Sequence, residues 1–239
     1  MLGNDVVDLE DPETRPETFR PRFDQRVFDD AERRAIAHDP EPHARRWAHW
    51  AAKEAAYKLA RQIDPRFVFS PKRLVARFAE PMDTAGSGTR FHGTLALPHA
   101  LAPGLSTLEL RGEIANGGVH VAALPQGEDW DAVVTRVETL TPDDDPSAAV
   151  RRLARDGIAA DLGVEPERVT IGRRGRIPTV EIDGRRCHMG ISLSHHGRFL
   201  AFATSHHVVA EGVVPEGAVA EGAGVAQSGV ASDRELGVA

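Results

Sequence analysis

The sequence predicts an α+β fold with two lobes, each combining packed helices with a small antiparallel sheet. Residues 40–63 carry the period of a helix, and strand patterns then continue to residue 125. The same order, a helix followed by short strands, recurs between residues 147 and 207. Because short strands joined by tight turns pair antiparallel, this order favours helices packed beside antiparallel sheets in both halves.

The helix predicted over residues 40–63 begins near two prolines and ends at Asp64-Pro65. Its apolar residues recur at four-residue spacing, as Trp47, Ala51, Ala55, Leu59 and Ile63. The strand patterns that follow are VFSPKRLVARFA, RFHGTLAL, LSTLELRGEI and GVHVAALP, and a turn at Ala-Asn-Gly-Gly joins the last two as a hairpin. The second half holds a helix in SAAVRRLARDGIAADLG and strands in RVTIG, RIPTVEI, CHMGISLS and RFLAFAT.

This order divides the chain into four parts. Residues 1–125 are expected to form a first lobe, and residues 147–209 a second. Residues 126–146 between them resemble an acidic linker with some structure of its own. Residues 210–239 consist mainly of Gly, Ala, Val and Glu without any period or aromatic residue, so we expect a disordered tail there.

Composition narrows the classes of function. The 239 residues include no run of 18 apolar residues, and the opening MLGNDVVDLED has no basic-then-apolar leader. A single cysteine, Cys187, fits a reducing compartment. We therefore expect a cytoplasmic protein with neither a membrane nor a nucleic-acid partner. Within a net charge of −7, residues 146–207 are rich in arginine, which suits either a polyanionic ligand or an ordinary solvated surface.

The predicted helix carries a group of charged residues at helical spacing. Trp50, Glu54 and Lys58 are four residues apart and share one face, while Lys53 lies on a neighbouring stripe. On an arbitrary helix, Glu54 and Lys58 would form a surface pair worth about 0.3–0.5 kcal/mol. Asp5, in GNDVVDLED, lies at the expected edge of a strand, where a turn or capping role is the ordinary alternative.

A second group closes an apolar strand near the end of the predicted second lobe. GISLSHHGRFLAFA places Ser194 and His195 before a Gly-Arg turn, which on its own is typical of a polar hairpin. Other familiar sites are not found: there is no Walker A motif, GRRGR lacks the spacing of a dinucleotide loop, and neither Cys-x-x-Cys nor His-Glu-x-x-His occurs.

Taken together, these segments resemble the 4′-phosphopantetheinyl transferase superfamily. The specific part is the pattern WxxKEAxxK, and the order of the motifs adds to it. The matching residues are Gly3-Asn4-Asp5-Val6-Val7-Asp8-Leu9, Arg26-Val27-Phe28 with Glu32 behind it, Trp50-x-x-Lys53-Glu54-Ala55-x-x-Lys58, Gly175-Arg176-Ile177-Pro178 and Ser192-Leu193-Ser194-His195. The resemblance implies the transferase fold with two pseudo-symmetric lobes.

The resemblance also implies a reaction. These enzymes move phosphopantetheine from coenzyme A to a serine of a carrier protein and release adenosine 3′,5′-bisphosphate, with Mg²⁺ as cofactor. By resemblance, Asp5 and Glu54 are the metal ligands and Glu54 helps to deprotonate the serine, which suits the oxygen ligands that Mg²⁺ prefers. Lys58 would reach the phosphate as a mobile point charge.

Four further residues are implied to bind coenzyme A. Ser194 and His195 would contact its nucleotide end, and Arg176 would add positive charge, together with Arg151, Arg152 or Arg155. Lys53 belongs to the motif, so pairing with phosphate or with the carrier protein is implied for it as well. The carrier protein would dock through an acidic helix, for which Arg20, Arg22 and Arg26 are candidates.

The sequence departs from the family in three ways. The motif order is that of the short holo-acyl-carrier-protein synthases, whereas the length is that of the surfactin-synthetase type, whose two halves occur in the opposite order. We therefore expect a long-type enzyme with exchanged halves that acts as a monomeric pseudo-dimer; an oligomer of short-type units with a long insertion at 64–125 is the alternative.

Position 7 is Val rather than a third acidic ligand, and the Gly-Lys-Pro element reads Gly-Arg-Ile-Pro.

Two other functions remain open on the sequence. One is a homologue without catalytic activity that binds a carrier protein or coenzyme A, although Asp5, Glu54 and Lys58 are all present. The other is a metal-dependent phosphohydrolase that uses the same two carboxylates, which would hydrolyse coenzyme A without any acceptor.

Overall fold

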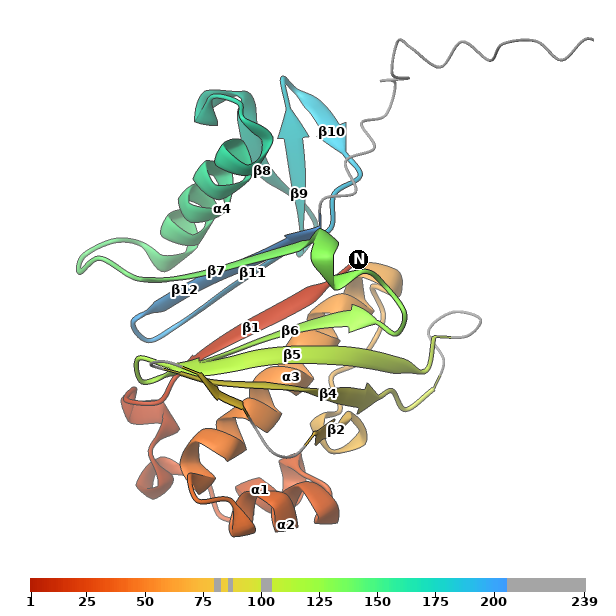
Figure 1. Cartoon of the computed structure of the whole chain (residues 1–239), viewed down its shortest axis with the longest axis vertical. Coiled ribbons are helices and arrows are strands. Elements are labelled where there is room, and N and C mark those ends of the chain that lie inside the picture. The colour runs from red at the N-terminus through yellow and green to blue at the C-terminus, as the bar shows by residue number, and fades with distance from the viewer. Residues whose placement is uncertain (80–82, 86–87, 100–104, 206–239) are drawn as a thin grey trace, which may run out of the picture.

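The first lobe is a six-stranded antiparallel sheet covered on one face by a long helix (Figure 1). The computed structural model describes residues 1–79, 83–85, 88–99 and 105–205. The strand order is β1-β6-β5-β4-β2, with β3 paired to β4. The strands span Gly3–Asp8 (β1), Val75–Phe78 (β2), Asp83–Ala85 (β3), Gly88–Ala96 (β4), Thr107–Ala115 (β5) and Gly118–Pro125 (β6).

The long helix, α3, spans Pro42–Ile63 and confirms the helix predicted over residues 40–63. Pro42 occupies its first turn, and it ends at Asp64, directly before Pro65. Of the predicted apolar stripe, Trp47, Ala51, Ala55 and Leu59 are buried, and Ile63 packs at the margin of the same core. Shorter helices precede α3: α1 (Phe23–Val27), α2 (Asp30–His38) and the 3₁₀ turns η1 (Pro12–Thr14) and η2 (Pro16–Thr18), with η3 (Pro71–Arg73) after it.

Strand β1 lies unusually close to α3. A Cβ atom at Gly3 would come within 1.9 Å of the carbonyl oxygen of Ala55, so only glycine allows this approach. The approach brings the residues that follow Gly3 in β1 beside those that surround Ala55 in α3. The first and second predicted motifs are thereby brought together.

The predicted hairpin is confirmed. β5 and β6 pair from Leu108↔Pro125 to Ala115↔Gly118, and Asn116 and Gly117 between them have φ values of 52° and 76°. Two consecutive residues with positive φ are what a tight turn compatible with strand twist requires, and Asn-Gly is the pair that tolerates them best.

The second lobe consists of α4 (Pro146–Leu162), the turn η5 (Pro166–Arg168) and two three-stranded sheets. One sheet has the order β10-β9-β8, from Arg185–Cys187, Ile177–Ile182 and Val169–Arg174. The other has the order β11-β12-β7, from Ile191–His196, Phe199–Ser205 and Val133–Thr139. Gly163 caps α4 in the left-handed conformation at φ 65°, as the predicted helix end requires. Mixed helices and antiparallel sheets thus confirm the predicted α+β class.

The predicted acidic linker, residues 126–146, contains the turn η4 (Trp130–Ala132) and strand β7. β7 pairs with β12 along its whole length, from Phe199↔Thr139 to Ser205↔Val133, so this segment also contributes a strand to the second lobe. The lobe boundaries themselves stay a prediction. The tail predicted to be disordered, residues 210–239, lies outside the described residues. Among the described helices, none combines the length and the apolar character needed to span a membrane.

Candidate active site at the seam between the lobes

The two lobes meet where β1 lies beside β11 (Figure 1). Among the described strands only β6 pairs with β1, and at its outer edge side chains of β11 take the place of a partner strand. Every second residue of β1 donates its backbone N–H to every second side chain of β11, at 3.0–3.2 Å. These pairs are Asn4 N to Ser192 Oγ, Val6 N to Ser194 Oγ, and Asp8 N to His196 Nδ1. Because alternate residues of a strand point to the same side, these side chains form a continuous seam along β1. The seam brings the first and last predicted motifs into contact.

The side chain of Lys58 contacts both strands of this seam. Its ammonium donates to the Asp5 carboxylate (Oδ1, 2.9 Å), to the backbone carbonyl of Asn4 (3.0 Å) and to the backbone carbonyl of Leu193 in β11 (3.3 Å). The same oxygen of Asp5 also accepts a hydrogen bond from Ser194 Oγ at 2.7 Å. The structure thus brings together Asp5, Lys58 and Ser194, which lie far apart in the sequence.

Glu54 lies one helical turn before Lys58, on the same face of α3. It is partly buried, and it accepts no hydrogen bond from the residues that the structure describes. The pKa of Glu54 is raised to about 7: burial is the largest cause, the negative charge of Asp5 adds to it, and the ammonium of Lys58 opposes both. The carboxylates of Asp5 and Glu54 are therefore close enough to interact electrostatically, and the ammonium of Lys58 interacts with both.

His120 and Asn4 complete the polar surroundings; Asn4 belongs to the first predicted motif, whereas no motif in the sequence predicted His120. The Asn4 amide donates to Nε2 of His120 at 3.2 Å, while Asn4 Oδ1 is buried without a partner among the described residues. Burial lowers the pKa of His120 to about 4, although Asp5 raises it, so its ring is neutral near pH 7. The only sequence signal for His120 is its place in the strand that pairs with β1.

A divalent cation would fit these residues. Two carboxylates are close enough to shift a pKa, and a cation between them would remove their repulsion. Neither neighbouring position supplies a third acidic ligand, because Val7 is buried in the core below α3 and both oxygens of Asp8 are bound to Arg198 at 2.9 and 3.0 Å. Asp11, Glu13 and His196 form another group of possible ligand atoms, mostly at the surface, where Asp11 already accepts from the N–H of Glu13.

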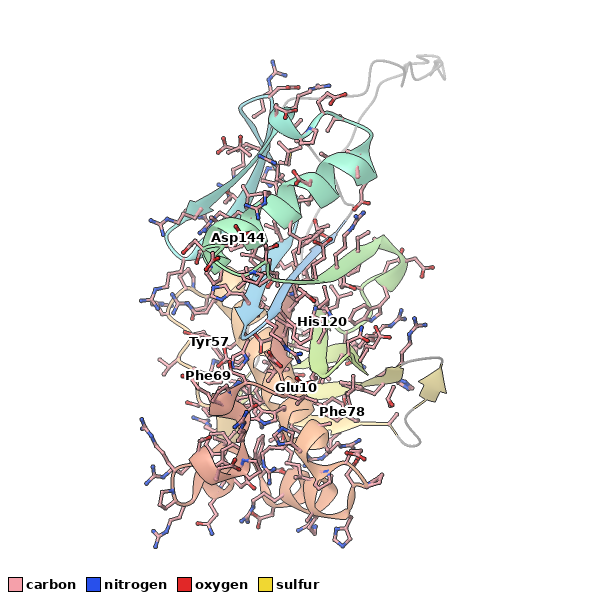
Figure 2. All side chains as sticks on the ribbon, turned by 90° about the vertical axis from the view of Figure 1, so that its left-hand side faces the viewer. Glu10, Tyr57, Phe69, Phe78, His120 and Asp144 are labelled. Atoms are coloured by element: carbon pink, nitrogen blue, oxygen red, sulfur yellow. The ribbon has the colours of Figure 1, made fainter. Side chains whose placement is uncertain are left out.

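Beyond Lys58, a pocket of about 380 Å³ opens between the lobes. Both α3 and the second lobe line it, and Figure 2 shows Tyr57 between the lobes with Phe69 beneath it. Five cationic side chains line the pocket, and its lining includes no carboxylate. They are Lys58, Arg61, Arg151, Arg173 and Arg176. A cavity with this concentration of positive charge suits a ligand with several negative charges.

The residues that the resemblance assigned to coenzyme A lie partly at this pocket and partly outside it. Arg176, His195 and Arg151 line the pocket, whereas Arg152 and Arg155 pair with Asp144 and Asp156 outside it. Two further cations, Arg61 and Arg173, were not predicted. Arg61 was detectable in principle because it lies one turn after Lys58 on α3, and it donates to the Tyr57 hydroxyl at 3.2 Å. Burial lowers the pKa of His195, and so does Lys58, which makes its ring a neutral hydrogen-bonding group.

The structure corrects the expectation for Lys53, which is not part of this pocket. Its side chain is 0 % exposed, and its ammonium donates to both oxygens of Glu32 at 2.8 Å and to the backbone carbonyls of Pro71 (3.0 Å) and Leu74. With every donor bound inside the core, Lys53 has none left for phosphate. Its stripe of α3 faces α2, whereas the stripe of Glu54 and Lys58 faces the seam.

The fold and the seam define a two-lobed α+β protein with paired carboxylates beside a cationic pocket. The family model of the 4′-phosphopantetheinyl transferase superfamily matches residues 1–86, which confirms for this part of the chain the resemblance predicted from its motifs. The matched part includes Asp5, Glu54 and Lys58 but not Ser192–His195. A solved structure of holo-acyl-carrier-protein synthase from Thermotoga maritima is similar at 13% identity and a TM-score of 0.35, over 76% of this chain and 82% of that one. No curated protein matches the sequence.

Proposed function

We propose that this protein transfers 4′-phosphopantetheine from coenzyme A to a serine of an apo acyl- or peptidyl-carrier protein, in a Mg²⁺-dependent reaction. One observation carries the proposal: the cationic pocket opens on Lys58, whose ammonium binds Asp5 beside the protonatable Glu54. All three residues lie in the part of the chain that matches the transferase superfamily.

The pocket suits coenzyme A because that molecule carries a pyrophosphate and a 3′-phosphate. Lys58 lies at the carboxylate end of the lining and would contact the pyrophosphate as a mobile point charge. Arg151, Arg173 and Arg176 belong to the second lobe and would hold the phosphate of the nucleotide end through paired N–H donors. Neutral His195 would add a hydrogen bond there without adding charge.

Asp5 and Glu54 are the residues that would hold Mg²⁺. When bound, the ion supplies charge neutralisation to the pyrophosphate oxygens as the phosphoryl group transfers. Oxygen ligands from one or two carboxylates, with substrate phosphates completing the set, are what Mg²⁺ usually takes, so Val at position 7 does not oppose the proposal.

The chemical step is a displacement at phosphorus. The carrier serine oxygen forms a bond to the phosphorus that bears pantetheine, and the bond from that phosphorus to the bridging oxygen breaks. Adenosine 3′,5′-bisphosphate leaves with the bridging oxygen. Glu54 would take the serine proton as general base.

The test is mass spectrometry of several apo carrier proteins incubated with the full chain, coenzyme A and Mg²⁺. We expect one carrier to gain the mass of one phosphopantetheine, and a carrier with its acceptor serine changed to alanine to gain nothing. Omission of Mg²⁺ with a chelator present is the second control. Intact binding of coenzyme A with no gain on any carrier would favour the binding homologue without catalytic activity, and release of phosphopantetheine without any acceptor would favour a phosphohydrolase.

Arginines of the pocket provide a second test. We expect Arg173→Ala and Arg176→Ala each to weaken coenzyme A binding about 10-fold, because a charge-assisted hydrogen bond contributes about 1.5–3 kcal/mol, and we expect the loss to shrink at high salt. Arg174→Ala is the matched control, since Arg174 is exposed on the same strand but does not line the pocket. An equal loss in all three variants, measured by titration calorimetry, would show that general charge rather than this pocket binds the ligand.

The carrier protein is proposed to dock near α1. Arg20, Arg22 and Arg26 are exposed there, and α1 reaches the seam side of α3 through the contact of Phe23 with Trp50, whose ring centroids are 6.0 Å apart. Trp50 lies one turn before Glu54 on the same face. Exposed positive charge on this side of the first lobe would suit the acidic helix of a carrier.

A further inference from the structure

Ser194 does not line the cationic pocket, although its neighbours Leu193 and His195 do. Its side chain points instead toward β1 and is buried, with 5 % of the residue exposed. There its hydroxyl lies between the backbone N–H of Val6, at 3.2 Å, and Oδ1 of Asp5, at 2.7 Å. The expectation that Ser194 contacts coenzyme A is therefore replaced by a contact with Asp5.

We propose that Ser194 is a positioning residue that holds the Asp5 carboxylate in the orientation required for a divalent cation. This inference rests on the proposed function, because it assigns a role toward the cation that Asp5 and Glu54 would hold. Ser194 itself touches neither substrate nor cation; it acts through Asp5.

The direction of the two hydrogen bonds follows from the groups involved. A backbone N–H only donates, so Ser194 Oγ accepts from Val6. A carboxylate only accepts, so the single hydroxyl proton goes to Asp5 Oδ1. The Ser194 hydroxyl thus accepts one hydrogen bond and donates another. Because the N–H of Val6 occupies its acceptor side, its proton is directed to Asp5.

The consequence concerns the other oxygen of Asp5. Oδ1 is held by Ser194 and by Lys58 at 2.7 and 2.9 Å, whereas Oδ2 has no hydrogen-bond partner among the described residues. Two donors on one oxygen fix the rotation of the carboxylate and leave the second oxygen for a cation. Hydrogen bonds of this kind to ligating groups typically contribute 10–100-fold in metal affinity.

Ser192 provides a matched control on the same strand. It lies two residues earlier, is 2 % exposed and accepts from the backbone N–H of Asn4 at 3.0 Å, but it has no contact with a carboxylate among the described residues. Ser192→Ala and Ser194→Ala each remove one hydroxyl and leave one buried N–H of β1 without its hydrogen-bond acceptor. The difference between them isolates the hydrogen bond to Asp5.

The experiment measures the affinity of the full chain for Mn²⁺ by electron paramagnetic resonance, without coenzyme A or carrier. We expect Ser194→Ala to weaken Mn²⁺ binding about 10-fold and Ser192→Ala to change it less than about 2-fold, with similar losses of melting temperature in both. Ser194→Cys keeps the size but donates weakly, so we expect an intermediate loss; it replaces Ser194→Ala should that variant fail to fold.

The outcomes separate this inference from the proposed function. Equal Mn²⁺ affinities in the two alanine variants overturn the role of Ser194 and leave the transferase proposal intact. The expected difference in Mn²⁺ affinity, combined with no transfer to any carrier, supports Ser194 and overturns the transferase proposal. No Mn²⁺ binding by the unchanged protein overturns the role assigned to Ser194, whereas the transferase proposal is then decided by the mass of the carrier proteins.

Discussion

Replacement of Glu54 by glutamine is expected to reduce phosphopantetheine transfer roughly 10³-fold, because the amide can neither take the serine proton nor bring its charge to a cation. The same change is expected to stabilise the metal-free protein at pH 8. Glutamine has almost the same shape as glutamate, and Glu54 accepts no hydrogen bond from the described residues, so little packing is lost.

The pH dependence of this stabilisation follows from the pKa of about 7 in the folded protein, against about 4.5 when the chain is unfolded. Below pH 4.5 Glu54 is protonated in both states, so the stability that its raised pKa contributes relative to the ionised form is fully present. Between pH 4.5 and 7 the unfolded chain releases the proton first, and that favourable effect is lost as the pH rises. Above pH 7 the ionised Glu54 costs about 2–3 kcal/mol relative to a neutral group.

Urea unfolding with a chelator present measures this effect. We expect Glu54→Gln to raise the free energy of unfolding by about 2–3 kcal/mol at pH 8 and by little at pH 4.5. Glu17→Gln, at an exposed position of η2, is the control and should change neither value. A destabilised Glu54→Gln variant at pH 8 would contradict the environment described for this carboxylate.

Replacement of Lys53 by methionine is expected to cost about 3–5 kcal/mol of stability, the largest loss that we predict for a single substitution. Glu32 is 1 % exposed and would be left as a buried carboxylate without its cation. In the intact protein, burial would by itself raise the pKa of Glu32, but neighbouring His49, 3.7 Å away, and the ammonium of Lys53 lower it below its usual value. The carboxylate also accepts from the backbone N–H groups of Asp29 and Ala76, both at 2.8 Å, so it connects α2 and β2 to α3.

The midpoint of urea unfolding at pH 7.5 provides the measurement. Lys72→Met is the control, because Lys72 is exposed on η3. Adding Glu32→Gln to Lys53→Met removes the unpaired negative charge of Glu32. We therefore expect the double variant to recover a large part of the stability that Lys53→Met loses. A loss under about 1 kcal/mol for Lys53→Met would show that the pair is far better hydrated than its burial indicates.

Features of the fold that depend on neighbouring residues could be predicted from the sequence. α3 was predictable because its apolar residues recur with the period of a helix and because prolines stand at both ends. The hairpin of β5 and β6 was predictable because Asn116 and Gly117 are the residues that a tight turn with positive φ requires. β7 was not predicted as a strand, because its partner β12 follows more than 60 residues later and supplies the contacts that order it.

The helical spacing predicted that Glu54 and Lys58 share one face, and the resemblance of the motifs added Asp5 to the same predicted site. The sequence could not distinguish the roles of Lys53 and Lys58, whose side chains leave α3 on neighbouring stripes. Only the packing decides that one stripe faces Glu32 in the core and the other faces Asp5 at the seam. Ser194 and His195 differ for a similar reason. Adjacent residues of a strand point to opposite sides, and the position of β1 beside β11 turns Ser194 toward Asp5 and leaves His195 at the cationic pocket.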